Sequence, residues 1–281
     1  MAIVTPMNKD GAIDFDSFIK LLKFHEDSGT DGIVLVGTTG ESATLNKIER
    51  EEIFKFAKNA TNIPLMAGIG SSSTSEACEL ADMALKNNIN ECLAVTPYYS
   101  KPSQKGLSLH YQELSKTEAN ITLYNVPGRT GVDLLPSTVL KLSEKENITG
   151  IKEAVNTESR FKDLLAIKAM RSDFLLLSGD DPTFVSFMKS GADGIISVAA
   201  NVMPKQIKKL SDLCFSKEFE EAEALNEKYL DLYELLFTEA SPSPCKFLLE
   251  KMSLLENNLR LPLHPISEEF KEEIYEAFNK I

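Results

Sequence analysis

The chain has 281 residues, of which 43% are hydrophobic and 26% are charged, the composition of a folded globular protein. Its formal net charge of −12 argues against a nucleic-acid partner, because such a surface needs clustered lysine and arginine. No apolar run approaches the roughly 18 residues of a membrane-spanning helix, and the first residues do not have the pattern of a secretory signal. We therefore expect a cytoplasmic protein with neither a membrane nor a nucleic-acid partner.

Eight short apolar runs recur at intervals of about 20–32 residues, with helical patterns between them. This alternation indicates strand–helix units and a parallel sheet. The runs are rich in Ile, Val and Leu without clean alternation, as expected for strands buried on both faces. Eight such units predict an α/β fold of the (β/α)8 TIM barrel type. The runs are 2–5, 33–36, 64–67, 92–95, 121–124, 148–152, 174–178 and 194–198.

The segments between the runs carry signals for helix ends. Asn46 followed by Glu49, and Ser73 followed by Glu76, have the capping-box spacing. The near copies 28–33 and 190–195 each read as a helix that ends at glycine before the next strand.

From about Lys217 onward the strand signal stops. Apolar residues from Phe219 to Leu236 recur at helical spacing, and the segment 241–244 breaks the pattern before further helical stretches. We therefore predict a catalytic barrel over residues 1–216 and a C-terminal helical segment over residues 217–281.

The cysteines and histidines do not have the spacing of a metal or disulfide site. We interpret the cysteines as small buried residues in a reducing compartment, and we expect each histidine in a solvated or hydrogen-bonded surface position. Asp180 and Asp181 are interpreted as a solvated turn instead of a metal site. Neither a metal nor a cofactor is expected. The scattered residues are Cys78, Cys92, Cys214, Cys245, His25, His110 and His264.

A lysine closes the sixth apolar run, in the segment 148–154. Lysine is seldom buried, so a strand that runs into Lys152 suggests an amine in a partly dry pocket. Desolvation favours a neutral amine, which attacks a carbonyl to form a Schiff base. The alternative is a strand-end lysine that extends to solvent.

Other strand ends carry polar side chains that would meet Lys152 in a barrel. Thr38 and Thr39 lie between two glycines, in a loop suited to gripping a carboxylate, although an ordinary turn is an equally good interpretation. The fourth run leads into Thr-Pro-Tyr-Tyr, which contains Tyr98 and Tyr99. The fifth ends at Tyr124 and is followed by Arg129, and three tyrosines beside an arginine exceed what packing requires.

These motifs resemble those of the dihydrodipicolinate synthases, also called 4-hydroxy-tetrahydrodipicolinate synthases, in the pyruvate-dependent class I aldolase superfamily. The resemblance covers nearly the whole chain. Two patterns with the family's spacing carry it: 32–49, containing Gly-Thr-Thr-Gly-Glu-Ser, and 124–154, from Tyr-Asn-Val-Pro-Gly-Arg-Thr to Gly-Ile-Lys-Glu-Ala. The family normally has several residues before the segment 2–6, so we expect the first strand to begin short.

The resemblance implies a lyase of the diaminopimelate and lysine biosynthesis pathway that condenses pyruvate with L-aspartate 4-semialdehyde. Lys152 would form the Schiff base with pyruvate, and Tyr124 would pass protons beside it. Thr39 would link Tyr124 to Tyr99 in a relay, with Tyr99 reaching the partner subunit of a homotetramer built as a dimer of dimers.

The remaining roles also follow from the resemblance. Thr38 and Thr39 would hold the pyruvate carboxylate, and Arg129 would hold the carboxylate of the second substrate. The backbone carbonyl of Ile196 would face the active site. The family's lysine-feedback site matches the positions of Ser42, Ala43, Lys47, Arg50, Glu76 and Tyr98. Lys47 and Arg50 add cations where inhibited synthases usually carry histidine or other polar residues, so we expect weak or absent inhibition by lysine.

Two alternative functions remain for this sequence. An N-acetylneuraminate lyase or a 2-keto-3-deoxy sugar-acid aldolase would run the same imine chemistry toward cleavage, but such lyases usually lack an arginine like Arg129. A barrel that only binds metabolites would not need Lys152, Tyr124, Thr39 and Tyr99 together.

Overall fold

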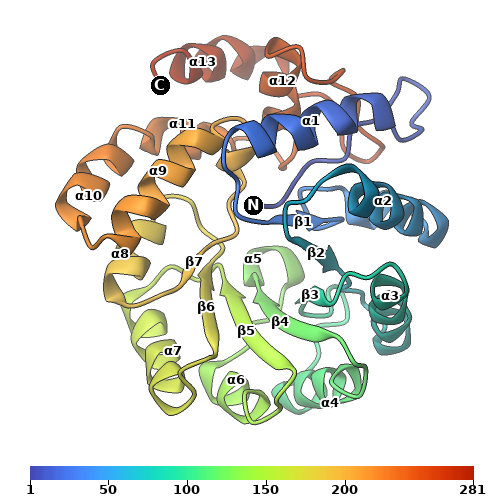
Figure 1. The fold of residues 1–281 in the computed structure, drawn as a ribbon, viewed down its shortest axis with the longest axis vertical. Coiled ribbons are helices and arrows are strands. Elements are labelled where there is room, and N and C mark those ends of the chain that lie inside the picture. Colours follow the sequence, from blue (N-terminus) through green and yellow to red (C-terminus); the bar gives the residue numbers. More distant parts are fainter. The chain divides into compact units, whose positions relative to one another are not determined.

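The computed structural model describes all 281 residues, and strands and helices alternate along most of the chain (Figure 1). The chain forms two compact units. One contains residues 1–64 and 197–281, and the other contains residues 65–196. No helix in either unit is long and apolar enough to cross a membrane.

The unit of residues 65–196 is built on six parallel strands, each paired with the next one in chain order. Helices follow the strands, and all of them except the short helix after β4 lie along the outer side of the curled sheet (Figure 1). The strands are β2 (Leu65–Gly68), β3 (Glu91–Val95), β4 (Asn120–Asn125), β5 (Ile148–Glu153), β6 (Leu175–Ser178) and β7 (Gly194–Ile195). The helices are α3 (Thr74–Lys86), α4 (Gln104–Leu114), α5 (Pro127–Thr130), α6 (Pro136–Leu142), α7 (Glu158–Met170) and α8 (Phe184–Ser190).

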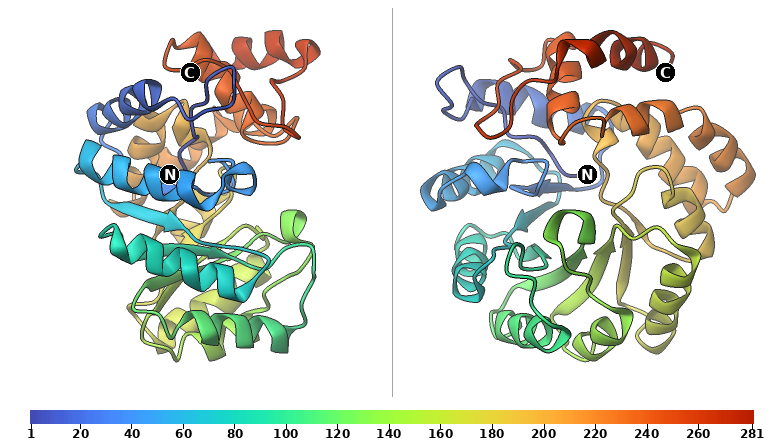
Figure 2. Two further views of the ribbon diagram at one scale, coloured as in Figure 1. Left: turned by 90° about the vertical axis from the view of Figure 1, so that its right-hand side faces the viewer. Right: turned by 180° about the vertical axis from the view of Figure 1, so that it is seen from behind.

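The other unit contains β1 (Ile33–Leu35) and the remaining helices. These are α1 (Phe15–Asp27), η1 (Ser42–Thr44), α2 (Lys47–Ala60), η2 (Ala199–Asn201), α9 (Pro204–Phe215), α10 (Phe219–Glu227), α11 (Leu230–Leu235), α12 (Ser243–Lys251) and α13 (Glu268–Phe278). The N-terminal loop lies beside the segment that follows α12 (Figure 2). Asn258 donates to the Met7 carbonyl at 3.1 Å, and Arg260 donates to the Gly11 carbonyl at 2.8 Å.

The first apolar run, predicted as a strand, forms only an isolated bridge to the second run. Ala2 forms a parallel bridge with Val34 of β1, and its N–H donates to the carbonyl of Ser197 at 3.0 Å. The Asn201 side chain makes two hydrogen bonds with the backbone of this run. Its amide donates to the Ala2 carbonyl at 2.8 Å, and its oxygen accepts from the Val4 N–H at 3.0 Å.

Several local predictions are confirmed and others are wrong. Asn46 and Glu49 form the expected capping box. Ser73 does not, because the Glu76 carboxylate accepts instead from the Ser71 hydroxyl at 2.5 Å. The helical pattern of residues 219–236 is interrupted after Glu227, so that α10 and α11 are separate helices. No strand follows β7, whereas the division at residues 216 and 217 stays a prediction.

The histidine prediction is wrong for two of the three residues. His25 and His110 are buried, with hydrogen bonds to Thr30 and Thr74 in place of water, and only His264 is exposed. Asp181 is also buried, so the pair at 180–181 is not simply a solvated turn. The four cysteines are free thiols, and Cys92, Cys214 and Cys245 are buried as expected, whereas Cys78 is only half-buried. Burial raises the pKa of Cys92 to about 12.

Candidate active site

Lys152 and Tyr124 occupy matching positions near the carboxyl ends of β5 and β4. They are register partners in the parallel pair, and the Lys152 Nζ lies 4.4 Å from the centre of the Tyr124 ring. Only 3% of Lys152 is exposed, and no carboxylate forms an ion pair with its amine. A buried amine is normally paired with an acid, so an unpaired one beside a phenol is a candidate for chemistry with a carbonyl.

Gly179 forms one wall beside this lysine. It follows β6, and a Cβ atom at this position would lie 3.0 Å from Lys152 Cε and 3.2 Å from the Glu153 carbonyl oxygen. A side chain there would press on the lysine stem. The absence of a side chain at Gly179 therefore leaves space for the Lys152 side chain.

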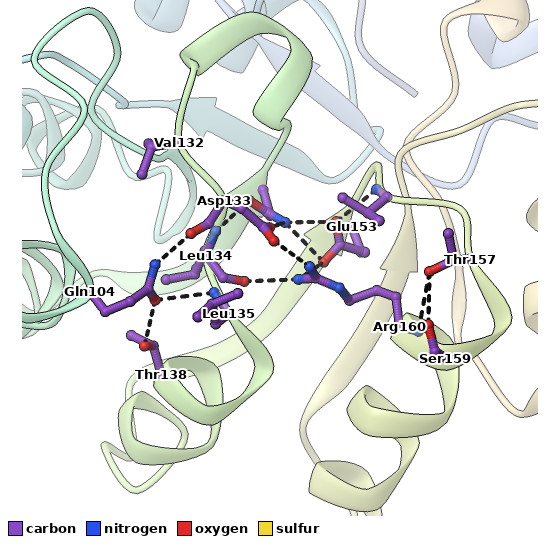
Figure 3. A network of polar contacts seen from close by, with 12 residues as sticks. Gln104, Val132, Asp133, Leu134, Leu135, Thr138, Glu153, Thr157, Ser159 and Arg160 are labelled. Carbon is purple, nitrogen blue, oxygen red and sulfur yellow. Dashed lines mark hydrogen bonds and ion pairs between the residues drawn. The ribbon is translucent and has the colours of Figure 1, made fainter.

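A polar network that includes Asp133, Glu153 and Arg160 surrounds the next residues of both strands (Figure 3). Asn125 and Glu153 are register partners, and the Asn125 amide donates to Glu153 Oε1 at 2.9 Å and to Asp133 Oδ1 at 2.8 Å. Arg160, in the first turn of α7, donates to Asp133 at 2.5 Å and to Glu153 at 3.3 Å. Burial raises the pKa of Glu153 to about 7, although the Val155 N–H, Arg160 and Asn125 oppose this shift.

Arg129 lies on α5, the short helix that follows β4. Its side chain is exposed and makes no ion pair, so it is available to an anion. The next residue anchors the helix, because the Thr130 hydroxyl donates to the Val132 carbonyl at 3.0 Å and accepts from the Thr96 hydroxyl at 3.1 Å.

The other site residues predicted in this unit lie near strand ends. Tyr98 is half-buried, whereas Tyr99 is 93% exposed and has a φ of +71°, which is unusual for a residue with a side chain. Ile196 follows β7 and is buried, and its N–H donates to the Ser178 carbonyl at 2.9 Å.

Thr38 and Thr39 lie in the tight loop after β1, in the other unit. Thr38 is half-buried and Thr39 is buried. Backbone hydrogen bonds close the loop, with the Gly40 N–H donating to the Gly37 carbonyl at 3.1 Å and the Glu41 N–H donating to the Thr38 carbonyl at 3.1 Å.

This loop is anchored by a buried ion pair. Lys246 of α12 pairs with Glu41, and neither side chain is exposed to solvent. The Lys246 ammonium also donates to the Asn258 carbonyl at 2.8 Å, and the second Glu41 oxygen accepts from the Arg260 N–H at 3.2 Å. Burial lowers the pKa of Lys246, and the Glu41 carboxylate opposes this shift.

The residues predicted for lysine feedback are divided between the two units. Ser42 and Ala43 belong to η1, and the exposed Lys47 begins α2. Arg50 is buried and donates to the carbonyls of Ser42 at 2.7 Å and Leu45 at 3.2 Å. In the other unit, Glu76 is half-buried on α3 and Tyr98 follows β3.

Sequence reasoning missed the residues that support these strand ends. Asn125 and Glu153 directly follow two residues that were singled out, so their position was the available signal. Lys246 interrupts an apolar stretch, which is a weaker form of the signal that pointed to Lys152. Asp133 and Arg160 carry no local signal at all. No group of three or more His, Cys, Asp or Glu residues gathers in a way that would hold a metal ion.

The chain is similar to known proteins over its full length. The model of the Dihydrodipicolinate synthetase family matches residues 1–281. A 4-hydroxy-tetrahydrodipicolinate synthase of Saccharophagus degradans is 43% identical over 280 residues, which cover 99% of this chain and 96% of that protein. One of Stutzerimonas stutzeri is 45% identical over 283 residues, covering 100% of this chain and 96% of that protein.

A solved structure agrees with these relatives. The chloride-inhibited dihydrodipicolinate synthase of Acinetobacter baumannii, complexed with pyruvate, matches with a TM-score of 0.96 and 42% identity, covering 99% of this chain and 96% of that chain. The predicted fold class is thereby confirmed as a (β/α)8 barrel with a helical C-terminal region. The relatives support the synthase interpretation over the sugar-acid lyases, and the chain belongs to the Dihydrodipicolinate synthetase family of enzymes.

Proposed function

We propose that this chain condenses pyruvate with L-aspartate 4-semialdehyde through a Schiff base on Lys152. The observation that carries this proposal is the buried Lys152 amine, which has no acidic partner and lies 4.4 Å from the centre of the Tyr124 ring. An amine that is not held by a carboxylate has its lone pair available once its proton leaves.

The first step is the attack of neutral Lys152 Nζ on the C2 carbonyl of pyruvate. The carbonyl oxygen takes up protons and leaves as water, and the nitrogen and C2 form a protonated imine. This imine is an electron sink, so the C3 methyl loses a proton and becomes an enamine nucleophile. Tyr124 is placed to give and take these protons as a general acid and base.

The enamine carbon then attacks the aldehyde carbon of the second substrate. A carbon–carbon bond forms, and the aldehyde oxygen takes a proton. The amino group of the second substrate attacks the imine carbon, which closes the ring and releases Lys152. Arg129 is the group proposed to bind the second substrate's carboxylate, because a guanidinium makes two parallel hydrogen bonds with a carboxylate.

The remaining roles are proposed from the residue types and their resemblance to the family. Thr38 and Thr39 hold the pyruvate carboxylate, Ile196 presents its backbone carbonyl, and Thr39 links Tyr124 to Tyr99. The 93% exposure of Tyr99 supports a role at a second subunit, within a homotetramer built as a dimer of dimers. We place the enzyme in the cytoplasm, where amino-acid biosynthesis takes place.

Borohydride reduction in the presence of pyruvate tests the proposal. Reduction of the imine should add one reduced pyruvate to the chain, and peptide mapping should locate it at Lys152. Lys152→Ala should lose both this adduct and the consumption of L-aspartate 4-semialdehyde, measured with a downstream reductase as coupling enzyme. An adduct on another lysine, or turnover by Lys152→Ala, contradicts the proposal.

A further inference from the structure

We propose that Asn125, Asp133, Glu153 and Arg160, here called the Asn125 network, position Arg129 relative to Lys152. The network does not touch substrate in this proposal, so its members are positioning residues. The inference rests on the proposed function, because it assigns to Arg129 the carboxylate of the second substrate. The network would thereby set the distance between the group that binds one substrate and the amine that binds the other.

The network lies on the reverse side of the two strands that carry the reacting groups. Successive side chains of a strand point to opposite faces. Lys152 and Tyr124 therefore share one face, and their neighbours Glu153 and Asn125 share the other. The Asn125–Glu153 hydrogen bond at 2.9 Å joins the strands one residue beyond the Lys152–Tyr124 pair. It fixes the register of the strand ends without occupying the space beside the amine.

Asn125 also closes the loop on which Arg129 lies. Its side-chain oxygen accepts from the Leu134 N–H at 2.9 Å, and its amide donates to Asp133 at 2.8 Å. The segment between residues 125 and 134, with α5 inside it, is thus tied together at its base by one side chain. The exposed Arg129 side chain has no hydrogen-bond or ion-pair partner, so its position depends on this base and on the Thr130 anchor.

Arg160 joins the two ends of this arrangement. Its guanidinium donates to the Leu134 carbonyl at 3.0 Å, to Glu153 at 3.3 Å and to Asp133 at 2.5 Å (Figure 3). One arginine therefore links the base of the Arg129 loop to the residue next to Lys152. Its side chain is 9% exposed, and the Glu153 side chain is fully buried, so water does not compete for the Arg160–Glu153 contact.

Arg171, at the opposite end of α7, provides a comparison within the same chain. It donates to the carbonyls of Ser143 at 2.7 Å, Lys145 at 2.8 Å and Ile148 at 2.8 Å, and so anchors the start of β5. Both arginines tie α7 to β5 with several hydrogen bonds. Only Arg160 makes these bonds at the end of β5 that carries Lys152. We therefore expect only Arg160 to influence the active site.

The test compares Arg160→Gln with Arg171→Gln. Because a misplacement of about 1 Å costs about 100-fold in rate, kcat/KM for L-aspartate 4-semialdehyde should fall by about that factor in Arg160→Gln. Most of the loss should lie in KM. Borohydride trapping of pyruvate on Lys152 should stay within about threefold of wild type, because a single carbonyl is attacked without Arg129. Arg171→Gln should retain both activities within about threefold when corrected for the folded fraction by circular dichroism.

Asp133→Asn is the second variant, in case Arg160→Gln does not fold. The Asp133 side chain is 34% exposed, so the change is tolerated more easily, and it removes the charge that Arg160 binds. It should raise the same KM and leave pyruvate trapping intact. Equal kinetic losses in the Arg160 and Arg171 variants, or no loss in either, overturn the positioning role. If wild-type protein gives no adduct at Lys152, the proposed function is wrong and this inference falls with it.

Discussion

Lys246 and Glu41 form an ion pair across 205 residues of sequence, and both side chains are completely shielded from solvent. Glu41 ends the loop that carries Thr38 and Thr39, and Lys246 belongs to α12. The C-terminal helical segment thus reaches the loop proposed to hold the pyruvate carboxylate. This contact gives the segment a role in holding that loop, in addition to covering apolar surface.

Lys246→Met should destabilise the protein by about 3–5 kcal/mol, because it leaves the Glu41 carboxylate buried without its partner. The free energy of unfolding in urea measures this loss. The double variant with Glu41→Gln and Lys246→Met should be more stable than Lys246→Met alone, since neither charge then remains buried. A double variant that loses the sum of both single effects would show that the two residues act independently.

Gly179→Ala should slow imine formation without unfolding the chain. The new Cβ would lie 3.0 Å from Lys152 Cε, so the lysine stem has to shift by a few tenths of an ångström. The rate should fall by less than the roughly 100-fold that a displacement of about 1 Å costs. The rate of borohydride-trapped adduct formation measures the effect. Gly32→Ala is the matched control, because its Cβ would meet only the Pro64 carbonyl oxygen at an ordinary 3.6 Å. An unchanged trapping rate in Gly179→Ala would contradict this prediction, because it would show that the new Cβ does not displace the Lys152 side chain.

Arg129→Ala should raise the KM for L-aspartate 4-semialdehyde and leave pyruvate trapping unchanged. Loss of a hydrogen bond to a charged group costs about 1.5–3 kcal/mol, which is about 10- to 150-fold. Arg129→Lys should recover little of this, because an ammonium does not make the paired contact. Lys105→Ala removes an equal charge from the exposed side of α4 and is the control for the general field. Equal effects of the two alanine variants would reduce the role of Arg129 to its charge.

The sequence predicted the strands because each is a local apolar run that both faces of the sheet bury. Lys152 and Tyr124 were found for the same reason, since each directly ends such a run. Local reasoning failed where two nearby hydroxyls compete for the same carboxylate. Glu76 has the capping-box spacing from Ser73, yet its carboxylate accepts from Ser71.

The supporting residues were outside the reach of any local pattern. Arg160 meets Asp133 from 27 residues away, and nothing near either residue specifies the other. The pairing depends on α7 and the loop after β4 meeting in space, which only the folded chain determines. The sequence therefore identified the groups proposed to react but not those that hold them in place.

L-lysine should inhibit this enzyme weakly or not at all, because Lys47 and Arg50 add cations to the positions that resemble the feedback site. Arg50 is committed to the carbonyls of Ser42 and Leu45, so its replacement would disturb the loop, whereas Lys47 is exposed. Lys47→Gln is therefore the informative variant, and it should be more sensitive to lysine than wild type. Initial rates at increasing lysine concentration measure this. Inhibition of the wild-type enzyme at submillimolar lysine would contradict the prediction.

Two buried histidines should make the protein less stable in mild acid. Burial lowers the pKa of His25 to about 3 and that of His110 to about 4, from the ordinary 6.5. A depressed folded pKa contributes stability that is present above pH 6.5 and is lost as the pH falls toward these values. At pH 5 the loss is about 2 kcal/mol for each imidazole, since one pKa unit corresponds to about 1.4 kcal/mol.

The Glu153 carboxyl changes the stability in the opposite direction over the same pH range. Its pKa is raised from 4.5 to about 7, so its contribution is complete below pH 4.5 and is lost as the pH rises through 7. The unfolding free energy is therefore measured at pH 7.5 and at pH 5, both for wild type and for the double variant His25→Gln, His110→Gln. Subtracting the variant's change from that of wild type isolates the histidine effect. This difference should be about 4 kcal/mol, because Glu153 contributes equally to both proteins. A difference near zero would mean that both imidazoles take up protons in the folded chain as readily as in the unfolded one.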